Sequence, residues 1–228
     1  MKVDLPVLKG EGYPGQDPDT PAAQFLVERV NRYPHEITLL VTGPTGNLYA
    51  AQKLDSGFYT KVQRIVVMGG YLKTLRIGYR DLHELNFSAH PDAAFNMLHA
   101  PCPVTIFPAQ ACLDAPYHAK DIFKANYWPC WLRFVLIQWL LTFGLYCGVN
   151  KIYLWDLLPA VYLTHPEIFD VQPFSISSSL VDLQHGMINT NQTKQGPMQS
   201  IASGISSQKA FFTQLEVAWQ QTSVKYPF

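Results

Sequence analysis

The sequence lacks an excess of charge of either sign and has few cysteines. Its 17 Lys and Arg residues balance 17 Asp and Glu residues. Because phosphate contacts dominate nucleic-acid binding, a chain without a basic excess is not expected to have a nucleic-acid partner. The cysteines form no CxxC pair and no dense framework, which predicts buried free thiols rather than disulfides; they are Cys102, Cys112, Cys130 and Cys147.

The sequence also lacks a recognisable targeting segment and a clear membrane span. Residues 1–8 are short and interrupted by Lys2, Asp4 and Pro6, so we expect no secretory signal and a cytoplasmic location. The apolar run 131–146 falls short of the about 20 residues that a span needs, and Arg133 interrupts it. We expect this run to form a helix buried in the protein or against a partner subunit, with no membrane association.

Alternating strand and helix patterns indicate an α/β fold. With 228 residues and 48% hydrophobic content, the chain suits a single domain over residues 1–228. We expect a three-layer, mostly parallel, Rossmann-like sheet with helices on both faces and ligands at the carboxyl ends of its strands. The polar segment 175–207 is expected to form loops with an edge hairpin around Gly186. The predicted strands are 37–41, 65–68 and 104–107, and the predicted helices are 22–33, 47–54 and 208–221.

The most informative stretch runs from Ile65 to Ala94. An apolar strand ends at the Gly69-Gly70 turn, and Pro91 marks a helix start further on. Between them, Glu84 and Asn86 lie in a polar segment. Taken alone, these two residues are typical of a solvated loop. Their position between a strand end and a helix start also suits a ligand-facing loop.

The motifs of this stretch resemble a known family. MGG followed by ELNFSAHPDAA resembles MGG…AEFNxxxDPEAA of the inosine-uridine type nucleoside hydrolases. In the same order along the chain, ITLLVTGPTGNLYAAQKL, PVTIFPAQACL and YLWDLLPAVYLTHPEIF resemble three further family segments, so the matches cover most of residues 37–169. The resemblance implies hydrolysis of the N-glycosidic bond of ribonucleosides in nucleoside salvage. A small-molecule nucleoside is the implied partner, and a homo-oligomer is expected.

The resemblance also implies roles for single residues. Glu84 and Asn86 match the side chains that grip the ribose hydroxyls, with Met68 packing near the sugar. Asp156 matches a calcium ligand, although a helix N-cap is an equally good interpretation of its position. The backbone carbonyl of Cys112 matches a second calcium ligand. Neighbouring His83 is expected to have only a surface or capping role.

Trp155 stands where inosine-uridine members carry a histidine that acts as the leaving-group acid. A tryptophan followed by aspartate resembles the purine-specific branch, in which an indole stacks on the base. Such stacking contributes about 1–3 kcal/mol, and Trp155 and Asp156 are therefore the implied catalytic pair. The alternative is that Trp155 is a core aromatic side chain in front of a buried helix.

One family motif has no counterpart in the sequence. The family's first strand has the form DxDxxxDD and supplies calcium ligands and the general base, whereas residues 1–8 align best with a later strand. We therefore expect an N-terminally shortened fold, and Gly78 stands about where another ribose-binding asparagine belongs. Loss of a general base costs about 10²–10⁴ in rate. The alternative function is thus a catalytically impaired or inactive homologue that acts as a nucleoside-binding, ribose-binding or interaction module.

Overall fold

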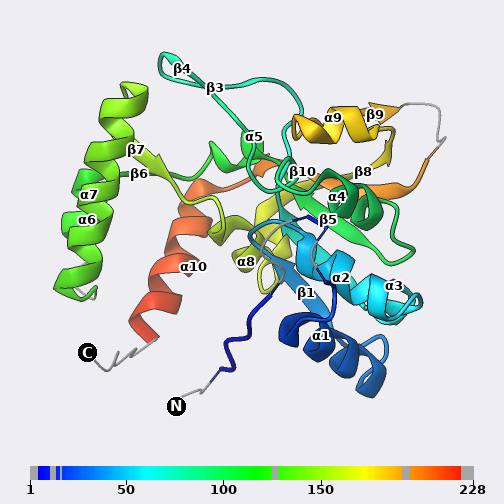
Figure 1. The fold of residues 1–228 in the computed structure, drawn as a ribbon. Coiled ribbons are helices and arrows are strands. Elements are labelled where there is room, and N and C mark those ends of the chain that lie inside the picture. Colours follow the sequence, from blue (N-terminus) through cyan, green and yellow to red (C-terminus); the bar gives the residue numbers. More distant parts are fainter. Residues whose placement is uncertain (1–4, 11–13, 16, 125–127, 192–195, 222–228) are drawn as a thin grey trace.

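The computed structural model describes residues 5–10, 14–15, 17–124, 128–191 and 196–221 (Figure 1). Its helices are α1 Pro21–Arg32, α2 Gly46–Leu54, α3 Phe58–Lys61, α4 Pro91–Leu98, α5 Ala109–Cys112, α6 Ala119–Lys124, α7 Cys130–Cys147, α8 Leu157–Tyr162, η1 Pro166–Ile168, α9 Leu180–Gln184 and α10 Gln208–Gln221. Its strands are β1 Thr38–Val41, β2 Arg64–Met68, β3 Leu75–Ile77, β4 Arg80–Leu82, β5 Val104–Phe107, β6 Pro116–His118, β7 Lys151–Tyr153, β8 Phe169–Ile176, β9 Thr190–Asn191 and β10 Met198–Ile205.

Several helices begin where the sequence supplies a capping side chain. Thr20 accepts a hydrogen bond from the backbone N–H of Ala23, and Pro21 occupies the first turn of α1. His90 caps α4 in the same way, again with a proline following it. A capping box between Ser179 and Asp182 starts α9. Local chemistry therefore sets these helix starts before tertiary packing contributes.

Six strands form the central sheet in the order β1-β2-β5-β10-β8-β9. The neighbours β1, β2, β5 and β10 are parallel, whereas β8 runs antiparallel to β10 and β9 antiparallel to β8. The register aligns Val41 with Val67 and Met68 with Phe107, so these strands end at the same edge. The predicted strands over 37–41, 65–68 and 104–107 are confirmed.

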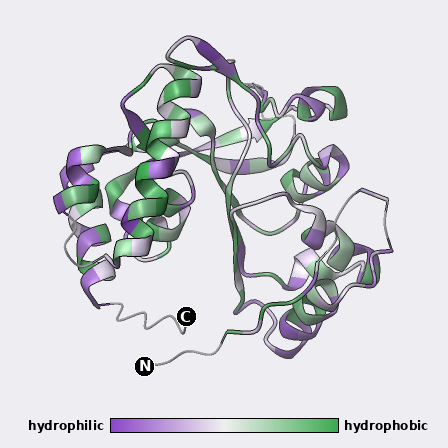
Figure 2. Cartoon of the chain, turned by 60° about the vertical axis from the view of Figure 1, so that its left-hand side comes forward, coloured by the Kyte–Doolittle hydropathy of each residue, from purple (hydrophilic) through white to green (hydrophobic). Residues whose placement is uncertain are grey.

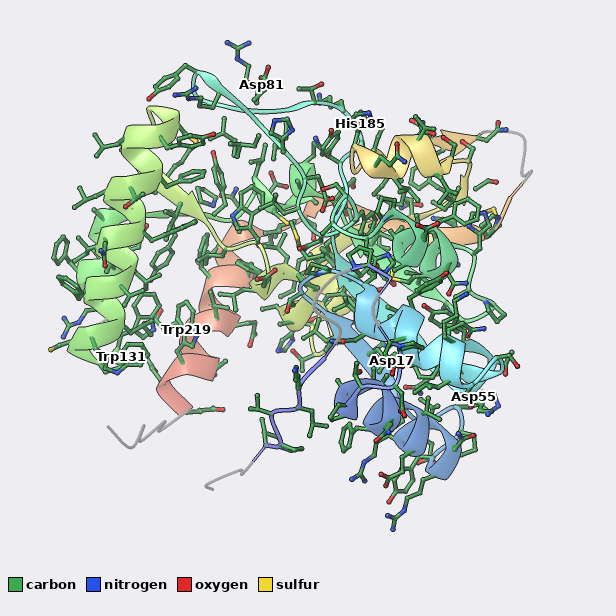
Figure 3. The ribbon with its side chains drawn as sticks, in the orientation of Figure 1. Asp17, Asp55, Asp81, Trp131, His185 and Trp219 are labelled. Atoms are coloured by element: carbon green, nitrogen blue, oxygen red, sulfur yellow. The ribbon has the colours of Figure 1, made fainter. Side chains whose placement is uncertain are left out.

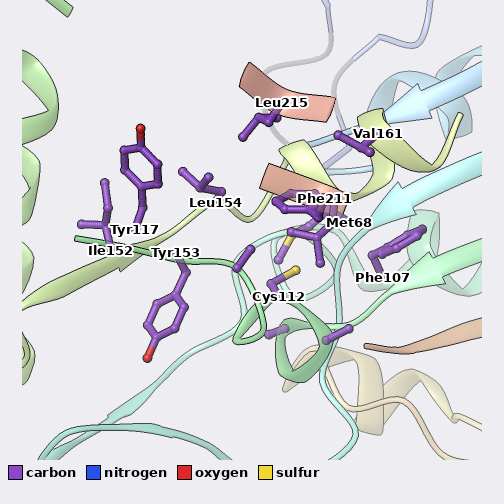
Figure 4. Packing of buried hydrophobic residues seen from close by; sticks show 14 of the residues in the cluster. Met68, Phe107, Cys112, Tyr117, Ile152, Tyr153, Leu154, Val161, Phe211 and Leu215 are labelled. Carbon is purple, nitrogen blue, oxygen red and sulfur yellow. The ribbon is translucent and has the colours of Figure 1, made fainter. Parts of the chain in front are cut away.

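Helices cover both faces of this sheet, which confirms the three-layer α/β architecture (Figure 1). Because successive strand residues point to opposite faces, Ile65 and Val67 pack in one apolar cluster, and Val66 and Met68 in the other. The first cluster includes residues of α1, α2, α4 and α9; the second includes residues of α5, α8 and α10. Figure 4 shows part of the second cluster, with Met68 and Cys112 at its centre.

The expectation for residues 175–207 was partly wrong. The end of β8 and β9 form an antiparallel pair at the sheet edge, but α9 lies between them, and β10 inserts between β5 and β8 in the middle of the sheet. Gly186 follows α9 with a φ of 70°, a conformation that suits glycine. The buried Gln199 side chain anchors β10, because it accepts from the Val104 N–H and donates to the carbonyls of Leu98 and Ala100.

The helix predicted over 131–146 exists as α7, but it is not buried in its own chain. Leu140 and Cys147 are its buried residues, whereas Phe134, Leu141 and Leu145 are exposed. Figure 2 brings this side of the molecule forward and shows hydrophobic residues along its helices. By length and composition alone, α7 is apolar enough to cross a membrane. The expected cover by a partner subunit stays a prediction.

The four cysteines are free thiols, as predicted. Cys102, Cys112 and Cys147 are buried, but Cys130 at the start of α7 is exposed. Burial raises the pKa of the Cys102 thiol to about 11. This thiol is therefore protonated at neutral pH and behaves as a small apolar side chain.

Neighbouring leucines in α7 provide a test of which side of this helix packs against the chain. Leu140 is 8% exposed and Leu141 is 62% exposed. We expect Leu140→Ala to lower the free energy of unfolding by about 2–5 kcal/mol because it leaves a cavity. Leu141→Ala is expected to change it by no more than about 0.5 kcal/mol. Chemical denaturation measures both; equal losses would mean that α7 is buried on both sides.

Candidate functional site

A cavity of about 500 Å³ opens at the carboxyl-terminal edge of the parallel strands. Thr42 follows β1, Met68 ends β2, and Ala109 begins the helix after β5; all three line the cavity. Open α/β sheets bind their ligands at this edge, and the volume lies within the range of about 300–1,000 Å³ for small-molecule sites. The remaining wall comes from the β3–β4 hairpin with the loop after it, from α7, and from the start of α8: Leu75, Leu82, His83, Glu84, Leu85, Asn86, Trp139, Phe143, Tyr146, Trp155 and Asp156.

Five of the six residues singled out from the sequence line this one cavity. They are Met68, Glu84, Asn86, Trp155 and Asp156, which come from distant parts of the chain. The sixth residue, Cys112, lies behind the wall, where its Sγ contacts the carbonyl oxygen of Trp155 at 3.6 Å. The fold thus assembles the residues that sequence motifs had suggested separately.

The carboxylate of Glu84 folds the loop that carries it. Its two oxygens accept hydrogen bonds from the backbone N–H groups of Asn86, Phe87 and Ser88 at 2.7, 2.8 and 2.9 Å. The residue is 7% exposed. A carboxylate has about four acceptor positions, so three of them are taken by the loop backbone. Gly186 packs against this side chain, because a Cβ on that glycine would lie 2.4 Å from the Cβ of Glu84.

Asn86 ties the same loop to the end of β2. Its Nδ2 donates to the carbonyl oxygen of Met68 at 2.8 Å and contacts the Met68 sulfur at 3.2 Å. These contacts use the amide N–H groups and leave Oδ1 as the atom that can accept a hydrogen bond from a ligand. Asn86 and Met68 therefore form one rigid corner of the cavity.

Asp156 occupies the N-cap position of α8, but its side chain makes no capping hydrogen bond. Its position had suggested either a helix cap or a calcium ligand, and the structure does not support the cap. Asp156 lines the cavity, and partial burial raises the pKa of its carboxyl above the ordinary value. Asp156 also raises the pKa of the buried Cys112 thiol, after the larger effect of desolvation, so these two residues lie close together.

Trp155 packs at the margin of the apolar cluster and also lines the cavity. Its ring lies 5.4 Å from that of Tyr153, at the margin of the apolar cluster, while the residue is only half-buried and lines the cavity. A ring held from behind and open in front is suited to stacking on a planar ligand. The packing on Tyr153 fixes its orientation.

The aromatic wall contributed by α7 was missed by the sequence analysis. Trp139, Phe143 and Tyr146 line the cavity, and the rings of Trp139 and Phe143 are stacked with centroids 6.1 Å apart. Their spacing at i, i+4 and i+7 places them on one helix face, a signal hidden by the apolar residues around them. His83, expected to have a surface or capping role, is exposed and lines the cavity as well.

The described residues do not make a calcium site. Among them, no group of three or more His, Cys, Asp or Glu residues could hold a metal ion. Calcium takes six to eight oxygen ligands, whereas the suggested pair provides one carboxylate, from Asp156, and one backbone carbonyl, from Cys112. That carbonyl already accepts a hydrogen bond from the Ala115 N–H.

Comparison with known sequences links this arrangement to one family. A family model described as "Inosine-uridine preferring nucleoside hydrolase" matches residues 5–213. The chain is 29% identical over 155 residues to "Probable uridine nucleosidase 2" of Oryza sativa subsp. japonica, covering 65% of this chain and 45% of that protein. Across the curated relatives, the matches span 16% to 54% of their own lengths.

Solved structures share the fold at low sequence identity. The "Plant nucleoside hydrolase - PpNRh1 enzyme" superposes with a TM-score of 0.77 at 19% identity, covering 93% of this chain and 72% of that one. The "Purine-Preferring Ribonucleoside Hydrolase from Gardnerella vaginalis" gives a TM-score of 0.76 at 19% identity, covering 96% and 70%.

The role of Glu84 in folding its loop can be tested by stability. Glu84→Gln replaces one acceptor oxygen with an NH2 group, which cannot accept a hydrogen bond from the backbone N–H groups of the loop. We therefore expect the free energy of unfolding to fall by about 1–3 kcal/mol. The exposed Glu36 provides the matched control, and Glu36→Gln should lie within about 0.5 kcal/mol of the wild type. If Glu84 served only to contact a ligand, both variants would unfold in urea at the same midpoint.

Asp156 is expected to make stability depend on pH in a particular direction. Because its pKa is raised on folding, the folded protein holds this proton to higher pH than the unfolded chain does. The free energy of unfolding therefore falls as pH rises from the ordinary value of 3.8 through the raised value, and stays lower above it.

Asp156→Asn removes this effect, so the variant should melt at a higher temperature than the wild type at pH 7. The difference should shrink as pH approaches 3.8. Melting temperatures across this range, with the exposed Asp170→Asn as a control, measure it. A variant less stable than the wild type at pH 7 would show that the Asp156 carboxylate gains a favourable contact on folding.

Proposed function

Because the chain belongs to the inosine-uridine preferring nucleoside hydrolase family, we propose that its cavity binds a ribonucleoside and hydrolyses the N-glycosidic bond. The observation that carries the proposal is that Met68, Glu84, Asn86, Trp155 and Asp156, picked from family motifs, all line one cavity. The products are the free base and ribose.

In this proposal the sugar lies against the corner formed by Met68 and Asn86. The Oδ1 of Asn86 accepts a hydrogen bond from a ribose hydroxyl, and the remaining acceptor position of Glu84 can take another. The bonds from Glu84 and Asn86 to the backbone hold both groups in place before the ligand arrives. Such preorganisation lowers the entropy cost of binding.

The base is proposed to stack on Trp155, facing the aromatic side chains of α7. During hydrolysis the oxygen of water bonds to C1′ of the ribose while the bond from C1′ to the base nitrogen breaks. The electron pair of that bond leaves with the base, whose nitrogen takes up a proton from solvent water. Asp156 is proposed to accept the proton of the attacking water, since partial burial moves its pKa toward the working range of a general base.

The class of base is proposed to be purine. A purine presents a larger ring system than a pyrimidine to Trp155 and to the aromatic side chains Trp139, Phe143 and Tyr146. The competing class is pyrimidine, because the rice relative is named for uridine. A panel of nucleosides separates the two.

A second candidate function is nucleoside binding without cleavage. One observation favours it. Within the part of the chain that the structure describes, Asp156 does not belong to a group of three or more acidic, His or Cys residues that could hold a metal ion. A bound nucleoside would then face a stacking wall and a sugar corner without the full means of activating water. Such a protein would sense or sequester its ligand.

Release of ribose tests these two candidates. The full-length chain is incubated with inosine, guanosine, uridine and cytidine, with and without calcium, while calorimetry measures binding. We expect release that is fastest with a purine nucleoside and that is lost in Asp156→Ala. Trp155→Ala should slow it by about tenfold to a hundredfold, the value of one stacked base.

Trp131→Phe is the matched control, because Trp131 lies outside the cavity at the other end of α7 (Figure 3). Its activity should equal that of the wild type. Binding without ribose release would support the second candidate against the first. A chain that neither binds nor cleaves any of these nucleosides would exclude both.

A further inference from the structure

The C-terminal end of α7 is capped by the tip of the β3–β4 hairpin. The last four carbonyl groups of a helix have no partners within it. Here Gly148 N–H donates to the Gly144 carbonyl at 2.7 Å. The hairpin supplies the other three donors from two residues, Tyr79 and Arg80, which we call the clamp.

Each clamp contact is specific. The Tyr79 hydroxyl donates to the Leu145 carbonyl at 2.5 Å, and its backbone N–H to the Cys147 carbonyl at 3.1 Å. Arg80 Nε donates to the Tyr146 carbonyl at 3.2 Å. A cation at this helix end also interacts favourably with the helix dipole. Four successive carbonyls of α7 are thus satisfied, three of them by a segment about 66 residues earlier in the chain.

The hairpin and the helix are in direct backbone contact. Gly78 has a φ of 58°, and a Cβ there would lie 1.8 Å from the Cys147 carbonyl oxygen. Gly148 has a φ of 72°, and a Cβ there would lie 2.3 Å from the Tyr79 ring. Only glycine permits this approach at either position. Figure 3 shows Asp81 of the hairpin above one end of α7, with Trp131 at the other end.

The clamp also reaches the cavity. The Arg80 guanidinium lies 5.0 Å from the centroid of the Tyr146 ring, and that ring lines the cavity. The outer face of α7 is exposed, so its C-terminal half is held by the packing of its inner face on the apolar cluster and by the clamp. The hairpin itself contributes Leu75 and Leu82 to the cavity. One contact therefore joins two walls of the same cavity.

We propose that Tyr79 and Arg80 are positioning residues that set the aromatic wall of the cavity by holding the C-terminal end of α7 to the hairpin. The inference deepens the proposed function and rests on it, because the wall is the surface against which the base stacks. Neither residue lines the cavity. Loosening the clamp should thus weaken nucleoside binding and leave the bond-breaking step almost unchanged.

Arg80→Met tests the proposal, because it keeps a long apolar stem and removes the charge and the donor. Arg76→Met is the matched control: Arg76 is exposed on the same hairpin, on the strand opposite Arg80. In Arg80→Met we expect KM for the best nucleoside to rise about tenfold, the effect of losing one charge-assisted hydrogen bond, with kcat within about twofold of the wild type. Arg80→Lys should recover part of the loss, since it restores the charge.

Hydrogen–deuterium exchange provides a readout independent of activity. Amides of residues 143–148 should exchange about tenfold faster in Arg80→Met than in Arg76→Met, while the first turns of α7 stay unchanged. If the wild type binds no nucleoside, the proposed function fails, and the clamp is then tested by the amide exchange rates alone. Equal exchange in the two variants would overturn it. Faster exchange with an unchanged KM would show that the clamp only stabilises the helix, and would overturn the positioning role.

Discussion

Parallel pairing of β1, β2, β5 and β10 is the constraint on which the site depends. Parallel strands all end at one edge, so the residues that follow them meet without any long-range side-chain contact. The alignment of Met68 with Phe107 puts the end of β2 level with the end of β5. Backbone hydrogen bonding therefore sets the part of the cavity formed by the strand ends, and the β3–β4 hairpin with its following loop, α7 and the start of α8 complete it.

The sequence was sufficient for elements whose own residues determine their structure. The β-branched runs of β2 and β5 are buried on both faces, as their composition predicts. β10 could not be found in this way, because MQSIASGI is rich in small and polar residues that suit a loop. The position of β10 in the sheet depends on contacts with distant residues. The Gln199 side chain donates a hydrogen bond to the Ala100 carbonyl, and a Cβ on Gly204 would lie 2.2 Å from the Asp114 carboxylate. Close approach of distant segments leaves no local pattern.

The same limit applies to the site. Family motifs located the cavity residues but did not indicate what surrounds each carboxylate. Glu84 accepts three backbone hydrogen bonds, whereas Asp156 is partly desolvated and forms no cap. Two acidic residues of one cavity thus have different environments, which the sequence motifs did not distinguish. The aromatic residues of α7 were visible as a spacing, but only the fold shows that their face meets the cavity.

The central position of β10 has a consequence for synthesis on the ribosome. β5 ends at Phe107 and β10 begins at Met198, so β5 has no partner on one side until the segment between them has been made. At about 5–20 residues per second this interval lasts roughly 5–20 s. During that time an apolar strand edge is open to pairing with other chains. The exposed edge of β5 therefore favours aggregation of the nascent chain in the interval before β10 has been made.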